Sequence, residues 1–287
     1  GGASNQWGGG SGGRVALLDY TLLAGAFADT AVGTDDFGVQ AVGGLATSCS
    51  SGSAGTVFLR PADAEYGDLL VDNSNRCTAA NAFTELPAVP VGTIGSGSLS
   101  ALALNVPGST WVPGLWTGTL FPPNRDEGAE TLLDNSVFEI VSNSADTLTV
   151  ADGDMTQVAD VGDSYGTLYG FDRIVVRRKG HVTTAADLLV AGDGAAVSVD
   201  QSTLAASRLE LSSETGGVSI VDGDLDLGLY AVGGIEIEGD SSFGGQSDVV
   251  IDGDLVLSGT TTFEHTANSM TVSGDLEVGA GANLVVD

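Results

Sequence analysis

The sequence is poor in basic residues and carries a single lysine, Lys179. Its 287 residues hold 9 Lys and Arg against 38 Asp and Glu, which gives a formal net charge of −29 at pH 7. A field of that sign repels nucleic acid and anionic membranes, so neither is expected as a partner. The sequence also lacks an uncharged apolar run of the roughly 20 residues that a membrane span needs. The best stretch, residues 16–28, contains Asp19.

Cysteine is equally scarce, since Cys49 and Cys77 are the only two. An even pair in a chain that is poor in lysine and rich in Asp and Gly fits an extracellular protein with one disulfide. Two free buried thiols are the alternative. The chain starts without Met and without a charged-then-apolar leader, which is typical of a processed form or of a piece of a longer chain. We therefore expect an extracellular or cell-surface location.

Helical periodicity is almost absent, whereas apolar residues alternate with polar ones in short runs separated by Gly, Asp, Ser and Asn. A hydrophobic content of 42% and a mean hydropathy of +0.20 exclude a disordered acidic chain. The pattern predicts an all-β protein. The paired inward positions of the expected strands include Val218 and Ile220, Leu225 and Leu227, Ile235 and Ile237, Leu255 and Leu257, Leu276 and Val278, and Leu284 and Val286.

The strands also repeat. Residues 218–228, 249–259 and 270–279 align with one another, and their Gly-Asp corners at Gly223 and Gly274 flank a third at residue 253. Short strands with recurring glycine corners every 20 to 30 residues are typical of a solenoid. The sequence therefore predicts a right-handed parallel β-helix (β-solenoid) of roughly ten coils, with a β-sandwich as the alternative.

The rhythm divides the chain into three regions. Residues 1–90 are predicted to be glycine-rich N-terminal coils, and residues 164–287 to be the C-terminal coils. Residues 91–163 hold four of the seven prolines and two of the three tryptophans, and they are predicted to form a small β insertion subdomain. Neither end of the chain offers an amphipathic capping helix, so both end coils are expected to have open strand edges.

Four segments resemble large secreted bacterial β-helix surface proteins of the adhesin-like type. They are GGSGGRV at 9–15, AGTVFL at 54–59, YGDLLVDN at 66–73 and IVSNSADTLTV at 140–150. The matching motifs are glycine corners and strand edges. The resemblance implies a β-helix fold and secretion, and it brings no catalytic residues to this chain.

These features predict a mechanical function without enzymatic activity. We expect an extracellular structural protein, a surface or appendage element. It is either a segment of a longer solenoid or a unit that stacks head-to-tail into a filament, because a heterologous contact that does not close gives an open polymer. Its partner would be a second copy or the remainder of a longer surface chain. A glycan-binding adhesin domain is the alternative, and a polysaccharide lyase or hydrolase is a further one, against which the scarcity of basic residues counts.

Three pairs of aspartates flank a glycine, so each pair can place two carboxylates on one turn. Repetition favours solvated coil corners, because an active site needs one special place. The functional alternative is that the aspartates bind Ca²⁺, although no cofactor is expected to be required. A further alternative is that a pair serves as the acid and base of a glycosidase. The pairs are Asp152 and Asp154, Asp222 and Asp224, and Asp252 and Asp254.

Two other groups could bind a ligand. The run Arg177, Arg178 and Lys179 is the only cationic concentration and could hold a carboxylated or sulfated glycan, although pairing with the protein's own acids is the alternative. Trp111 and Trp116 could stack on sugar rings, and a small core within the insertion is the alternative.

Overall fold

The computed structural model is nearly all β, and its stacked parallel strands form a β-solenoid of about five turns, which confirms the predicted fold class. It divides into two compact units. We call Gly1–Glu85, Gly170–Thr183 and Val190–Asp287 the solenoid unit, and Leu86–Tyr169 with Thr184–Leu189 the insertion unit. The structure describes residues 9–24, 39–46, 49–79, 82–125, 132, 136–192, 194–212, 217–232, 234–245, 249–265 and 269–286. Within these residues, no helix is long and apolar enough to cross a bilayer.

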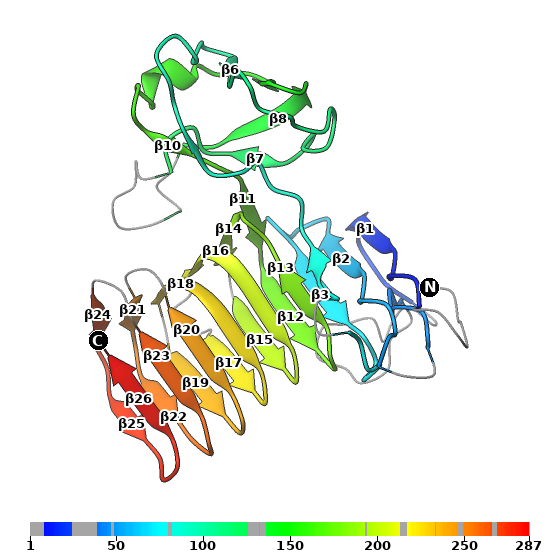
Figure 1. Ribbon diagram of the computed structural model, residues 1–287, viewed down its shortest axis with the longest axis vertical. Coiled ribbons are helices and arrows are strands. Elements are labelled where there is room, and N and C mark those ends of the chain that lie inside the picture. The colour runs from blue at the N-terminus through cyan, green and yellow to red at the C-terminus, as the bar shows by residue number, and fades with distance from the viewer. Residues whose placement is uncertain are drawn as a thin grey trace. The chain divides into compact units, whose positions relative to one another are not determined.

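A nine-stranded sheet forms one side of the solenoid unit, and its strands follow the coil order (Figure 1). From β3 onward every neighbouring pair is parallel. In order, the strands are β1 (Arg14–Tyr20), β2 (Thr56–Pro61), β3 (Asp68–Asp72), β12 (Arg173–Arg177), β15 (Ala196–Asp200), β17 (Gly217–Val221), β19 (Gly234–Glu238), β22 (Leu255–Leu257) and β25 (Leu276–Val278).

The return strands of the same coils pair in a second parallel sheet. Its main path is β16 (Thr203–Ser212), β18 (Asp224–Val232), β20 (Ser242–Gly245), β23 (Thr262–His265) and β26 (Asn283–Val286). Two pairs of strands extend this sheet. β13 (His181–Thr183) pairs with β16 and with β4 (Thr84–Glu85). β21 (Val249–Asp252) pairs with β18 and with β24 (Met270–Val272).

In-register apolar side chains fill the space between the two sheets. Because side chains alternate across a strand, each strand turns one row inward, and parallel pairing stacks that row on the same row of the next coil. Phe243 of β20 stacks on Phe263 of β23 with ring centroids 4.2 Å apart. On the nine-stranded side the buried column is Ile174, Val197, Val218, Ile235 and Leu255.

The two described strands that precede β3 differ in direction from the later parallel coils. β2 runs antiparallel to β3, and β1 runs parallel to β2, so the two first strands oppose all later ones. Backbone hydrogen bonds join the segments 9–13 and 41–44 to residues 50–56. The expectation of roughly ten coils is wrong, because the solenoid has about five turns. Its described parallel coils begin at β3.

The insertion unit has its own antiparallel strands and its own core. β5 (Gly92–Thr93) pairs with β10 (Ser164–Tyr165), so the unit extends beyond the predicted 91–163. The core packs around Leu104, Phe121, Ile140 and Leu148. The remaining elements are β6 (Ala103–Asn105), β7 (Leu120–Phe121), β8 (Phe138–Asn143), β9 (Thr147–Val150) and a 3-10 helix (Met155–Gln157), and β11 (Leu168–Phe171) and β14 (Asp187–Ala191) each continue into the solenoid unit.

Candidate functional site

The aspartates at the solenoid corners join one coil to the next. Asp222 Oδ1 accepts the backbone N–H of Asp240 at 2.9 Å, and Asp254 Oδ1 accepts that of Asp275 at 2.8 Å. Asp224 and Asp252 accept the hydroxyl groups of serines one coil further on, Ser242 and Ser273. One oxygen of each carboxylate is thus engaged in coil stacking, which supports the structural interpretation of these corners.

The third pair, Asp152 and Asp154, lies in the insertion unit. Asp154 caps the 3-10 helix by accepting the N–H and the hydroxyl of Thr156. The hydrogen bond from the Thr156 hydroxyl is the main reason why the pKa of Asp154 is lowered. Within the described part of the chain, no group of three or more His, Cys, Asp or Glu side chains is placed to hold a metal ion.

The basic run is paired with acids of the neighbouring coil. Asp72 of β3 is buried, and its carboxylate forms ion pairs with two arginines. Its Oδ2 lies 2.9 Å from Nε of Arg177 and 2.5 Å from Nη2 of Arg178. Arg173 makes a bidentate pair with Asp68, and this hydrogen-bonded carboxylate raises the pKa of Arg173. The arginines therefore cross-link β3 and β12, as the alternative interpretation of the run proposes. Lys179 is half-buried in the turn that follows.

The spacing of charged residues in the sequence is a signal for the ion pairs between β3 and β12, and the prediction of a ligand-binding basic run does not use it. Asp68 and Asp72 are four residues apart, as are Arg173 and Arg177, and the parallel register places each acid beside one arginine. Side chains four apart in a strand point to the same side. Matching charge spacings in two strand segments thus predict that the strands are neighbours.

Trp111 and Trp116 form part of the core of the insertion unit. Their rings meet edge to face with centroids 5.1 Å apart. Trp116 is 3% exposed, so its ring has no free face for a sugar, and Trp111 packs against the same cluster. The arrangement supports the alternative interpretation, in which the two rings are a small core.

A disulfide joins Cys49 to Cys77 beside the glycine-rich segments. The buried side chain of Asn73, which follows β3, accepts the N–H of Gly43 at 2.9 Å and donates to the carbonyl of Gly52 at 3.2 Å. Together these bonds fix two glycine segments to the first coil. A covalent link of this kind is typical of proteins in oxidising compartments.

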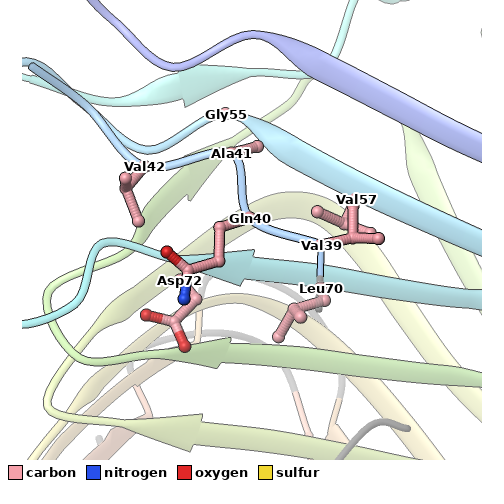
Figure 2. A pocket seen from close by; sticks show the side chains of 8 residues that line it. All are labelled: Val39, Gln40, Ala41, Val42, Gly55, Val57, Leu70 and Asp72. Carbon is pink, nitrogen blue, oxygen red and sulfur yellow. The ribbon is translucent and has the colours of Figure 1, made fainter. Parts of the chain in front are cut away.

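Two cavities lined by described residues of the solenoid unit are poor ligand sites. A cavity between Gln40, Val57, Leu70 and Asp72 has a volume of about 10 Å³, about the space that one water molecule needs (Figure 2). A wider hollow of about 420 Å³ lies outside β17, β19 and β22, because Gly217 pairs with Gly234 and neither has a side chain. Its lining carries carboxylates but no basic side chain.

In the last described coil, positions that are buried in the preceding coil are exposed. Leu276 and Val278 of β25 are in register with Leu255 and Leu257 of β22, which are fully buried. Leu276 is nevertheless 51% exposed and Val278 is 44% exposed, and on β26 Val286 is 54% exposed. The inward apolar row is thus covered by a further coil at β22, whereas no described coil covers it at β25.

Comparison with known proteins found no matching family model, no matching curated protein and no matching solved structure.

Proposed function

We propose that the protein is an extracellular structural element whose last coil docks another solenoid coil, so that copies stack head-to-tail into a filament. The observation that carries this proposal is the exposed apolar row of the last coil, which includes Leu276, Val278 and Val286. An uncovered strand edge with apolar side chains on its inner face is a template for further pairing.

The corner hydrogen bonds favour a coil as the occupant. Asp254 accepts the N–H of Asp275 in the next coil, and Asp275 stands in the same column at the uncovered end. A further coil in register would continue the apolar row and this column of hydrogen bonds together. A globular partner with a different repeat would continue neither.

The disulfide and the charge support an extracellular mechanical role. Cys49 and Cys77 are bonded, as expected in an oxidising compartment. A net charge of −29 keeps separate stacks apart by mutual repulsion. Of the residues that could bind a sugar, Trp111, Trp116, Arg177 and Arg178 are engaged within the fold.

Negative-stain microscopy with sedimentation of the purified chain tests the proposal. We expect unbranched stacks in the wild type and their loss in Leu276→Asp, because a carboxylate on the inner face of the last coil resists burial. Val112→Asp is the matched control, since Val112 is 61% exposed in the insertion unit and should leave the stacks intact. Discrete monomers of the wild type at every concentration would overturn the proposal.

A further inference from the structure

We propose that residues 39–46 form a strap over an apolar patch of the solenoid unit, and that the Cys49–Cys77 disulfide keeps this strap closed until a reductant opens it. Figure 2 shows the first half of the strap beside the two strands that carry Val57 and Leu70. The strap lies at the first coil, and its opening does not depend on the docking proposed for the last coil.

The patch lies on the outer face of the nine-stranded sheet, which is the face turned away from the inner apolar column. Leu70 of β3 and Val175 of β12 are in register, and each follows an inward residue, so both point outward. Val57 of β2 pairs with Leu70 across the antiparallel step and lies on the same face. With Leu59 they form a cluster of buried side chains outside the main core, and Val39 of the strap packs against it.

The outer face changes from apolar to polar beyond this patch. The row that carries Leu70 and Val175 continues in the next three strands as Ser198, Ser219 and Glu236. These three side chains are half-buried or exposed, whereas the two apolar ones are buried. Apolar side chains on this face therefore coincide with a cover, as expected because a large apolar patch is unfavourable in water.

Hydrogen bonds to the backbone of the strap fix it beside the first coil. Asn73 Oδ1 accepts the N–H of Gly43 at 2.9 Å, and the guanidinium of Arg76 donates to the Gly43 carbonyl. Ser51 Oγ accepts the N–H of Ala46 at 3.2 Å. A cavity of about 10 Å³ remains between the strap and the sheet, so their packing is incomplete.

The disulfide fastens the end of the strap covalently. Cys49 follows Ala46 by three residues, and Cys77 directly follows Arg76, which is one of the anchors of the strap. Cys49 is exposed and Cys77 is half-buried. Exposed disulfides are more open to exchange with thiols than buried ones, so a dithiol reductant can reach this bond.

The exchange releases the strap from the first coil. One thiolate of the dithiol attacks Sγ of Cys49, the S–S bond breaks, and Cys77 leaves as a thiolate that takes up a proton. The second thiol of the reductant then displaces Cys49 and becomes part of its own disulfide. Two electrons and two protons thus pass to the protein, and the strap keeps its hydrogen bonds as its remaining anchors. Loss of the cross-link favours the open state, in which the apolar patch meets water.

Hydrogen exchange followed by mass spectrometry tests the strap. We expect dithiothreitol to speed amide exchange in residues 39–46 by roughly 100-fold and to leave β15 and β17 unchanged. Binding of Nile red, an uncharged apolar dye, should rise at the same time, because the patch is uncovered. The double variant Cys49→Ser with Cys77→Ser is the matched control. It should show the fast exchange without reductant and no further change with it.

Two results would overturn the proposal. One is an unchanged exchange rate of the strap after titration has shown both thiols to be free. The other is an equal acceleration in β2, β3 and β12, since the disulfide would then hold the whole first coil and not the strap. Fast exchange confined to the strap, with dye binding, supports it. Stacking is measured separately by sedimentation of Leu276→Asp, so either proposal can fail without the other.

Discussion

At the scale of single residues, the glycines near the first coil are required because backbones touch there. A Cβ on Gly12 would overlap the carbonyl oxygen of Ala41 and the amide nitrogen of Gly55. A Cβ added to Gly13, the next residue, would have nothing within 4 Å. The high glycine content of this region is thus explained in part by close contact between backbones.

Gly12→Ala should therefore lower the free energy of unfolding by about 2 kcal/mol or more, in the range of overpacked sites. Gly13→Ala is the control and should change it by less than about 0.5 kcal/mol, as at other surface positions. Thermal unfolding followed by circular dichroism measures both. Equal losses in the two variants would contradict the close contact.

His181 should make the solenoid unit sensitive to mild acid. Burial lowers its pKa below the ordinary value of 6.5, and the carboxylate of Asp224 opposes this in part. The unfolded chain then takes up the proton more readily than the folded one, so stability falls as the pH drops below about 6.5. We expect His181→Gln to reduce the loss of Tm between pH 7.5 and pH 5.5. The same loss in both proteins would refute this role.

At the scale of elements, β3 and β12 are joined by charge as well as by backbone. Asp72 is 8% exposed and faces two guanidinium groups. Asp72→Asn should destabilise the protein by about 3 kcal/mol, because it leaves buried cations without their counter-ion. Asp19→Asn is the control: its pair with Arg60 is exposed, and such pairs contribute about 0 to 1 kcal/mol. Chemical denaturation measures the difference, and similar values would contradict a buried pair.

The corner aspartates give a prediction about calcium. We expect Asp254→Ala to lower the free energy of unfolding by about 1 kcal/mol, because the N–H of Asp275 loses its acceptor. Asp152→Ala is the control, since no described residue donates a hydrogen bond to it. Ca²⁺ and then a chelator should leave the Tm of the wild type unchanged. A rise with Ca²⁺ that is absent in Asp254→Ala would instead assign the corner to the metal.

Local patterns predict the elements of the regular coils and miss how distant elements meet. Val218 and Ile220, or Leu255 and Leu257, are readable because one face of each short strand is buried and the other is wet. The antiparallel step between β2 and β3 has no such signal, because alternation looks the same in parallel and antiparallel strands. The pairing of Asp72 with Arg177 spans 105 residues, a distance at which periodicity carries no information.

At the scale of the whole molecule, acidic and basic residues are unevenly distributed along the chain. Residues 209–287 hold 15 acids without a Lys or Arg, whereas all nine basic residues precede them. Stacked coils place like charges close together, and salt screens that repulsion. The sequence predicts the sign and extent of this field, because it depends on composition alone.

The C-terminal coils should therefore open first at low salt. Raising the ionic strength from about 0.01 M to about 1 M shortens the Debye length from about 30 Å to about 3 Å. We expect slower amide hydrogen exchange in β22, β23 and β25 at high salt, with little change in β3 and β12, whose acids are paired. A neutral osmolyte is the control. Equal slowing in both groups of strands would contradict an electrostatic cause.

The neighbouring strands β3 and β12 also have a consequence for the order of folding. Asp68 and Arg173 meet across 105 residues, whereas the later coil between Asp254 and Asp275 closes a loop of 21. Loop-closure entropy makes that joint about 1.4 kcal/mol costlier than an ordinary coil. A folded insertion unit shortens the effective loop, because Val89 is held to Thr167 by a hydrogen bond of 2.7 Å. An insertion unit that folds first therefore favours the pairing of β3 with β12 by shortening the loop that this pairing must close.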